Sequence, residues 1–375
     1  MKVLVNMISL FQAGPKTVAL GYLEGLAEYL SLDKKNGFVI LLPNIKDLKI
    51  RAKKLGLYDT CTILEVQYPF IKPRFIFKLF YDHIYTPYVA FKYKVDYIFM
   101  TANFASLFTK KEQLVLFHNI HYVQSHNPFS SFLQKLKYSL EKKLFFFTLK
   151  YKKPIYLVQL NCIKEELSLH VDKDRIYVHK MIPPKSDFKC SQDKYNEVKQ
   201  SLISFANYKK LFLPAKFHPN KNFWLIIILA EYISKKNLRI RIFLTLDDSD
   251  YLSLVKEKEF LKEIIINLGF IDYAEIKCFY KNMDALIYPS INESYGFPIV
   301  EAVLSNIKTI LPKTEFSIEL INDNGYFFNL NDVESLYLSI DNFMIDKKEV
   351  LSSCDFDFNW NSNIQQIINI FEEEK

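Results

Sequence analysis

The stretch NESYGFPIVEA, residues 292–302, places two glutamates on either side of a glycine and a proline. It follows the apolar run DALIYPS (284–290), which has the character of a buried strand. Pro298 suits the first turn of a helix, where the N–H that proline lacks would have no partner. The stretch is therefore predicted to join a strand to a helix, with Glu293 in the loop and Glu301 one turn into the helix.

The same loop has the features of a site for an anionic or oxygen-rich ligand. Gly296 has no side chain to block a ligand, and the N–H groups around Gly296 and Phe297 lie at the positive end of the predicted helix. Both carboxylates, Glu293 and Glu301, can face one pocket there. From the spacing alone, a plain loop with solvated acids and a glutamate that favours the helix dipole is an equally good interpretation.

Strand-like and helical patterns alternate along both halves of the chain, which predicts an α/β protein with parallel sheets covered on both faces. The polar stretch 181–196, with its paired prolines, lacks this periodicity and separates the halves. We therefore expect two doubly wound, Rossmann-like domains, at 1–185 and 200–352, that face a cleft. Strands are expected at 2–8, 37–43, 95–100, 113–117, 155–160, 210–214, 239–245, 268–271, 284–289 and 307–311, and helices at 16–31, 220–235, 251–267, 273–282 and 298–305.

The composition limits the class of protein. A length of 375 residues suits two domains, since a single core seldom grows that large. The net charge of +7 is compatible with anionic ligands or an anionic membrane surface. No apolar run is long enough to span a bilayer. Five scattered cysteines without a C-x-x-C pair make a zinc site or a disulfide framework unexpected, and reduced thiols in the cytoplasm are the simplest interpretation.

Two more stretches complete a recognisable pattern. LPAKFHPNKN (213–222) follows a predicted strand and carries two lysines, and NLGFIDYAEIKCFYKNMDALIYPS (267–290) supplies a glycine–aromatic turn, a helix and a strand. The combination resembles the carboxyl-terminal domain of family 4 retaining glycosyltransferases, which have the GT-B fold. The resemblance covers residues 211–330 and is carried by Lys216, Lys221, Gly269-Phe270, Pro289-Ser290, Glu293, Gly296-Phe297-Pro298 and Glu301.

The resemblance implies a nucleotide-sugar donor and assigns roles around it. Lys216 and Lys221 would neutralise the charge that grows on the leaving phosphate, without a metal ion or a cofactor. The family usually has arginine where Lys216 stands. Since lysine lacks the bidentate fork of arginine, Lys221 is expected to contribute more of the binding to the phosphate. Glu301 would hold the ribose hydroxyls, and Glu293 would lie against the donor sugar. Backbone groups would make the remaining contacts, to sugar and phosphate (Gly296, Phe297, Pro298, Ile299) and to the base (Phe270, Ile271).

The amino-terminal half resembles the family less closely. Gly14 lies in AGPKT, a predicted turn between the first strand and the first helix, where the family is glycine-rich near the donor phosphate and acceptor. A simple strand–helix turn is as good an interpretation.

His118 ends the predicted strand 113–117, and a histidine at such a strand end contacts the donor sugar in the family. A general base there is also chemically reasonable. His121 and His126 are close enough to compete for this role. A helix at 358–374, after a tryptophan, would pack back on the first domain, as it does in the family.

Aromatic and basic residues are interleaved at 68–94 and again at 132–153. Such stretches suit an anionic membrane interface or stacking on single-stranded nucleic acid. They are also compatible with buried aromatics beneath solvated lysines. Given the resemblance, we expect peripheral membrane contact and no nucleic acid.

We therefore predict a retaining, metal-independent glycosyltransferase of the hexosyl or deoxyhexosyl type. It would move a sugar to a glycan or lipid-linked glycan in bacterial surface polysaccharide biosynthesis, such as lipopolysaccharide O-antigen or capsule. It would be cytoplasmic, peripheral on the inner face of the membrane. The Asp-x-Asp pairs at 247–250 and 355–357 are not expected to bind a metal. Two alternatives stay open: a glycoside hydrolase that uses Glu293 and Glu301, and a non-catalytic basic aromatic binding module.

Overall fold

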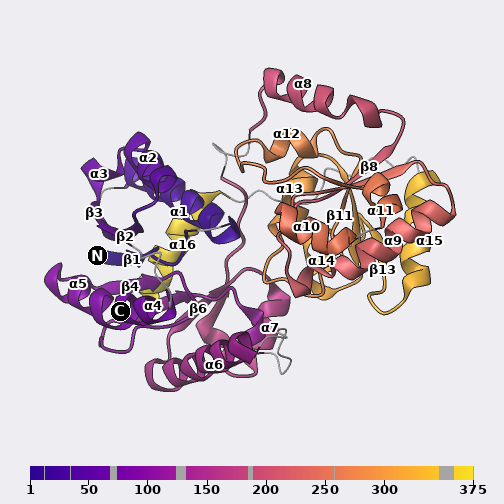
Figure 1. Ribbon diagram of the computed structural model, residues 1–375. Helices are drawn as coiled ribbons and strands as arrows, with labels where there is room; N and C mark the ends of the chain where they lie inside the picture. The colour runs from indigo at the N-terminus through magenta and orange to yellow at the C-terminus, as the bar shows by residue number, and fades with distance from the viewer. Residues whose placement is uncertain are drawn as a thin grey trace. The chain divides into compact units, whose positions relative to one another are not determined.

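The chain forms two compact units in the computed structural model, which describes residues 1–11, 13–33, 35–67, 74–123, 132–184, 189–256, 258–345 and 359–374. The amino-terminal unit is Met1–Pro184 with Asp357–Lys375, and the carboxyl-terminal unit is Lys185–Phe356 (Figure 1). Each unit has one all-parallel sheet with helices, which confirms the predicted α/β class with two doubly wound parts.

The sheet of the amino-terminal unit has the strand order β3-β2-β1-β4-β5-β6-β7, with every neighbouring pair parallel. The order reverses direction between β1 and β4, as it does in doubly wound folds. Central strands such as β2 are buried on both faces because helices cover the sheet. The strands are β1 (Lys2–Asn6), β2 (Gly37–Pro43), β3 (Thr62–Val66), β4 (Tyr97–Met100), β5 (Glu112–Leu116), β6 (Ile155–Val158) and β7 (Ile176–Val178).

The helices of this unit connect successive parallel strands. One segment, from α4 through a π-helical turn to α5, is continuous over Arg74–Lys92. The helices are α1 (Ala13–Leu32), α2 (Lys46–Lys54), α3 (Leu57–Thr60), α4 (Arg74–Phe80), the π-helix η1 (Tyr81–Tyr85), α5 (Thr86–Lys92), η2 (Ile120–Tyr122), α6 (Phe132–Lys152), α7 (Asn161–Ser168) and η3 (Lys173–Arg175).

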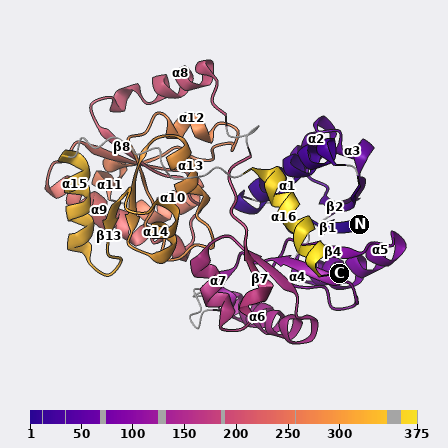
Figure 2. The same ribbon diagram turned by 180° about the vertical axis from the view of Figure 1, so that it is seen from behind.

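The last helix, α16 (Trp360–Glu373), packs along α1, and both views show it in yellow beside the indigo α1 (Figures 1 and 2). Trp360 makes this contact, and α1 has glycine where the ring approaches. A Cβ at Gly21 would lie 2.0 Å from the Trp360 ring, so a larger residue there would push the helices apart. The Trp360 indole donates to the Ile182 carbonyl at 3.1 Å. The chain end is thus an integral part of the amino-terminal unit.

The sheet of the carboxyl-terminal unit has the order β10-β9-β8-β11-β12-β13, again all parallel, with the reversal between β8 and β11. Its strands are β8 (Lys209–Leu213), β9 (Ile240–Leu244), β10 (Ile265–Asn267), β11 (Ala285–Ile287), β12 (Lys308–Pro312) and β13 (Tyr326–Phe328). Its helices are α8 (Gln192–Ser201), η4 (Ile203–Phe205), η5 (Pro219–Lys221), α9 (Phe223–Lys235), α10 (Asp248–Val255), α11 (Glu259–Ile264), α12 (Ile276–Tyr280), α13 (Phe297–Leu304), α14 (Glu315–Ile321) and α15 (Val333–Ile345).

Three predicted elements differ from the observed ones. The strand predicted at 268–271 is observed earlier in the chain, as β10 at Ile265–Asn267, within the range predicted as a helix. The helix predicted at 16–31 already begins at Ala13, so Gly14 lies in its first turn and not in a connecting turn. The helix predicted at 251–267 is divided into α10 and α11. Lys256, between them, has a φ of 50°, which a continuous right-handed helix cannot contain.

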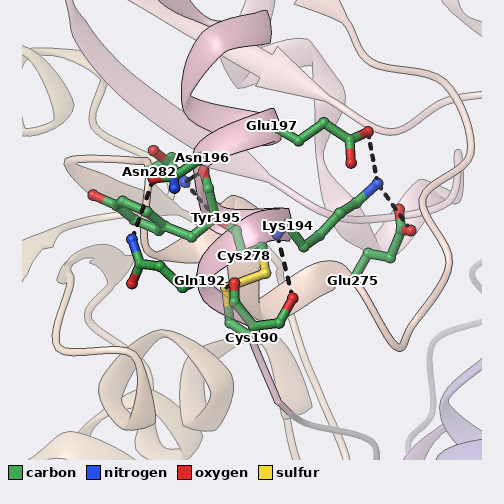
Figure 3. The surroundings of a disulfide bond; sticks show 10 residues. Cys190, Gln192, Lys194, Tyr195, Asn196, Glu197, Glu275, Cys278 and Asn282 are labelled. Atoms are coloured by element: carbon green, nitrogen blue, oxygen red, sulfur yellow. Dashed lines mark hydrogen bonds and ion pairs between the residues drawn. A yellow bond between two sulfur atoms is a disulfide. The ribbon is translucent and has the colours of Figure 1, made fainter.

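The expectation that all the cysteines are reduced is wrong for Cys190 and Cys278. These two residues form a disulfide across 88 positions of sequence, with their Cα atoms 5.1 Å apart (Figure 3). The bond joins the segment before α8 to α12, and Lys194 of α8 reinforces this contact through its ion pair with Glu275, the residue before α12. The spacing of the cysteines in the sequence did not suggest this disulfide, because Cys190 and Cys278 meet only when α8 packs on α12 in the folded chain. Cys61 and Cys162 are not in a disulfide.

None of the helices within the described ranges is long and apolar enough to cross a membrane.

Candidate functional site

Glu293 is the centre of a polar cluster at the carboxyl end of β11. Its Oε1 atom accepts hydrogen bonds from Ser290 Oγ at 2.5 Å and from Tyr288 OH at 2.9 Å. The same oxygen forms an ion pair with Lys221, whose ammonium also lies 4.7 Å from the centre of the Tyr288 ring. Its second oxygen, Oε2, accepts no hydrogen bond from any described residue. That oxygen is therefore available to a hydroxyl of a ligand.

Lys221 reaches this cluster because two loops are tied together by their backbones. The Ile291 N–H donates to the Asn220 carbonyl at 2.8 Å, and the Ser290 Oγ lies 3.0 Å from the same carbonyl. The loops follow β8 and β11, the neighbouring strands at which the strand order reverses. Ligands of doubly wound sheets bind at the carboxyl ends of strands at such a reversal. The sequence-predicted pair Lys221 and Glu293 is thus brought together at the expected place in the sheet.

Glu301 occupies a different environment, inside α13. Its side chain is buried, and its Oε2 accepts a hydrogen bond from Tyr280 OH at 2.9 Å. Burial raises the pKa of this carboxyl to about 7, although the hydroxyls of Tyr280 and Tyr273 act in the opposite direction. Glu301 can therefore exchange a proton near neutral pH.

Gly296 is the residue that allows the turn into α13. Its φ is 86°, in the left-handed region that favours glycine, and it precedes Phe297, the first residue of the helix. The Ile299 N–H donates to the Gly296 carbonyl at 2.9 Å, and Pro298 has no N–H. Of the four backbone positions predicted to bind sugar and phosphate, only Gly296 and Phe297 therefore keep an N–H for a ligand.

Three other predicted donor-binding residues lie outside this hydrogen-bonded cluster. Lys216 is exposed and forms no ion pair with a described residue. Phe270 follows the left-handed Gly269 and is 82% exposed, and Ile271 is half-buried. A cavity of about 650 Å³ opens between α9, α10 and α11, but none of the predicted donor residues lines it. That cavity is therefore not the predicted donor site.

His118, in the amino-terminal unit, is held by Asn103. The backbone N–H of His118 donates to Asn103 Oδ1 at 2.8 Å, and Asn103 Nδ2 lies 3.3 Å from His118 Nε2 of the ring. Burial lowers the pKa of His118 to about 4, and the nearby Lys78 acts in the same direction. His118 is thus a neutral hydrogen-bonding group at physiological pH and a weak base. The competing His121 accepts a hydrogen bond from Tyr138 through its carbonyl, and His126 lies outside the described residues.

Several residues of these clusters were not assigned a role from the sequence. Tyr288 and Ser290 hold Glu293, Asn220 joins the loops, Tyr280 binds Glu301, and Asn103 binds His118. The signal that could have found Tyr288 and Ser290 is their position at a strand's carboxyl end beside a carboxylate. The other three are brought in by tertiary packing, which no local pattern contains.

Metal-ligand groups were also sought in the described ranges. No set of three or more histidine, cysteine or acidic side chains there is close enough together to hold a metal ion. In the DDSD stretch, Asp247 precedes α10, and Asp248 and Asp250 lie in its first turn, where carboxylates favour the helix dipole. Asp355 and Asp357 lie outside the described residues.

Comparison with known proteins shows what the chain and its fold are similar to. Residues 194–354 match the family model of glycosyl transferases group 1. HepE from Anabaena, crystallised with UDP and glucose, is 14% identical and has a TM-score of 0.67, covering 100% of both chains. The fold is accordingly that of GT-B glycosyltransferases. The match over residues 194–354 confirms the expected resemblance at the level of that group.

Two curated relatives match over shorter lengths. The O-antigen chain mannosyltransferase RfbU of Salmonella typhimurium is 32% identical over 82 residues, which is 22% of this chain and 23% of RfbU. An uncharacterised glycosyltransferase of Methanocaldococcus jannaschii is 19% identical over 215 residues, or 54% of each protein. The chain therefore spans about a quarter and about half of the lengths of these relatives.

Proposed function

We propose that this protein is a retaining, metal-independent glycosyltransferase of family 4 that transfers a hexosyl or deoxyhexosyl group from a nucleotide-sugar donor. The observation that carries the proposal is the cluster of Lys221, Glu293, Ser290 and Tyr288 at the strand-order reversal of the group 1 domain. A cation and a carboxylate held side by side there suit the two ends of a sugar–phosphate bond. HepE, with the same fold, was crystallised with UDP and glucose, which supports a nucleotide-linked donor.

The charges of the cluster match the charges that the reaction creates. As the bond from the sugar's anomeric carbon to the diphosphate oxygen breaks, the carbon becomes positive and the phosphate more negative. The Lys221 ammonium would stabilise the phosphate, and the carboxylate of Glu293 would lie against the sugar. A charge-assisted hydrogen bond contributes about 1.5–3 kcal/mol, and each ~1.4 kcal/mol specific to the transition state gives tenfold in rate. No metal ion is required for this stabilisation.

Retention would follow from attack on the face that the diphosphate leaves. The acceptor oxygen bonds to the anomeric carbon as the bond to the phosphate breaks, and its proton passes to the departing phosphate oxygen. This path needs no covalent enzyme intermediate. Glu293 supports it, because a carboxylate oxygen hydrogen bonded by both Ser290 and Tyr288 is a poorer nucleophile.

We also propose the acceptor class and the place of action. The acceptor is a glycan or lipid-linked glycan of a bacterial surface polysaccharide, which the similarity to an O-antigen mannosyltransferase supports. The protein would act from the cytoplasm, peripherally on the inner face of the membrane, and nucleic acid is not among its partners.

A glycoside hydrolase is the second candidate, and one observation favours it. Glu301, with a pKa of about 7, could act as the general acid of a carboxylate pair in which the ion-paired Glu293 is the second member, as in paired-carboxylate hydrolases. Its burial against Tyr280 argues against that role, because a general acid must reach the leaving oxygen.

One experiment separates the two candidates. Thermal unfolding is measured with nucleoside diphosphates and with their sugars, and the stabilising donor is then incubated with acceptor glycans in the presence and absence of EDTA. We expect a stabilising nucleotide sugar and, by NMR, a product that keeps the donor's anomeric configuration with EDTA present. Inversion or EDTA sensitivity would contradict the mechanism. Glycan hydrolysis without any nucleotide would contradict the transferase assignment itself.

A further inference from the structure

The helical segment from α4 through α5 exposes a row of large apolar side chains. They recur every three or four residues, which places them on one side of the helix. The row, which we name the apolar stripe, consists of Ile76 (60% exposed), Phe80 (46%), Ile84 (54%), Tyr88 (55%) and Phe91 (83%). An exposed apolar row of this length, unlike single scattered residues, marks an interaction surface.

The other side of the same segment is firmly anchored in the unit. Asp82 is buried, pairs with Lys78 and accepts a hydrogen bond from Asn6 at 3.1 Å. Asn6 also donates to Thr86 Oγ1 at 3.0 Å, and the buried His83 accepts from the Leu107 N–H at 3.2 Å. The stripe is thus presented by a helix whose orientation is fixed by buried hydrogen bonds.

The exposed charged residues that directly follow Phe91, the last residue of the stripe, are basic. Lys92 and Lys94 are exposed at its carboxyl end, whereas Asp82, the segment's acid, is buried in its ion pair. Helix α6 of the same unit repeats the pattern: its exposed apolar residues are Leu136, Leu140, Phe147 and Tyr151, and its lysines include Lys137, Lys143 and Lys150. Its acid, Glu141, is engaged by Lys137 and Tyr122.

We propose that the apolar stripe is a docking surface for an anionic membrane, with its apolar side chains in the headgroup region and Lys92 and Lys94 against lipid phosphates. The purpose of this contact rests on the proposed function, which includes peripheral membrane association. The apolar stripe gives that association a location in the molecule. Amphipathic helices with one apolar side and flanking lysines bind anionic lipid surfaces through both features.

Two other occupants fit the surface less well. A second copy of this chain, packed symmetrically through the stripe, would bring the lysines of both copies to one interface. Single-stranded nucleic acid requires rings on which bases stack. Two of the five stripe residues, Ile76 and Ile84, are aliphatic. A membrane accepts aliphatic and aromatic side chains alike, and anionic headgroups match the lysines.

The test is flotation of the full-length protein with vesicles of phosphatidylcholine alone or with added phosphatidylglycerol. We expect binding to the anionic vesicles that Ile84→Glu with Phe91→Glu weakens by about tenfold or more, from the lost burial of two large side chains. Leu169→Glu is the matched control, since Leu169 is 76% exposed in the same unit but outside the stripe. Circular dichroism establishes that all variants are folded.

Each other outcome overturns the proposal. It fails if the wild-type protein does not bind anionic vesicles, binds phosphatidylcholine equally well, or is unaffected by the double substitution. It also fails if light scattering reveals a dimer that the stripe variant dissociates. The flotation assay contains no nucleotide sugar, so its result does not depend on transferase activity. Vesicle binding without transferase activity would refute only the proposed function. Transfer to a soluble acceptor without vesicle binding would refute only the role of the stripe as a docking surface.

Discussion

Lys221 and Glu293 form an ion pair that joins the loop after β8 to the loop after β11. The lysine assigned to the donor's phosphate is thus already neutralised by the carboxylate assigned to its sugar. A donor that brings a diphosphate to this site would compete with Glu293 for the ammonium, and the released carboxylate could accept a sugar hydroxyl. In the proposed function, the pair would therefore couple recognition of the phosphate to recognition of the sugar.

Replacement of Lys221 tests this coupling. Lys221→Met should lower kcat by about ten- to a hundredfold or more, since one charge-assisted contact to the leaving phosphate is lost. Lys216→Met is the control, because Lys216 is exposed and unpaired in the described structure. We expect its effect to be smaller. Steady-state kinetics of the two variants decide the point, and a larger loss in Lys216→Met would reverse the assignment.

Glu301 should make stability depend on pH. The pKa of the Glu301 carboxyl rises from 4.5 to about 7 on folding. Its contribution to the free energy of unfolding is therefore fully present below pH 4.5 and is lost as the pH rises through about 7. The amplitude is roughly 3 kcal/mol at most. Glu301→Gln keeps an oxygen for Tyr280 but cannot ionise, so its melting temperature should exceed that of the wild type at pH 8, and the difference should disappear below pH 4.5.

The same substitution should weaken donor binding if Glu301 holds the ribose. A neutral amide accepts hydroxyl hydrogen bonds less strongly than a carboxylate. Calorimetry in buffers of different ionisation enthalpy should reveal proton release when the wild type binds a nucleoside diphosphate near pH 7, and no release in Glu301→Gln. Proton uptake by the wild type, or equal release by both proteins, would falsify the ribose assignment.

Local sequence patterns predicted the strands and helices of this protein better than the contacts between segments that are distant in the sequence. Continuous apolar runs such as GFVILLP became buried parallel strands, because strands covered on both faces leave that signature. Gly296 and Pro298 marked the start of α13 through their backbone preferences. The Cys190–Cys278 bond and the contact of Asn103 with His118 depend on segments that meet only after folding. No pattern within a short window contains that information.

His118 should serve as a neutral hydrogen-bonding group. Its pKa of about 4, lowered by burial and by Lys78, keeps it uncharged from pH 5 to pH 8. Transfer should therefore show no titration of this residue in that range, and His118→Gln should mainly raise KM for the donor. If His118 were a general base, its replacement would instead lower kcat by about 10²–10⁴-fold. His121→Gln is the control, and an effect confined to it would move the role to that neighbour.

Reduction of the Cys190–Cys278 disulfide should destabilise the carboxyl-terminal unit. A bond that closes 88 positions of chain restricts the unfolded state, and the chain-entropy estimate is about 4–5 kcal/mol. Urea denaturation with and without reductant should give a lower midpoint for the reduced protein, and Cys190→Ser should match it without reductant. Cys61→Ser, which leaves the bond intact, should change the midpoint little. If reductant leaves the wild-type midpoint where it was while alkylation and mass spectrometry prove both thiols free, the bond is not a source of stability.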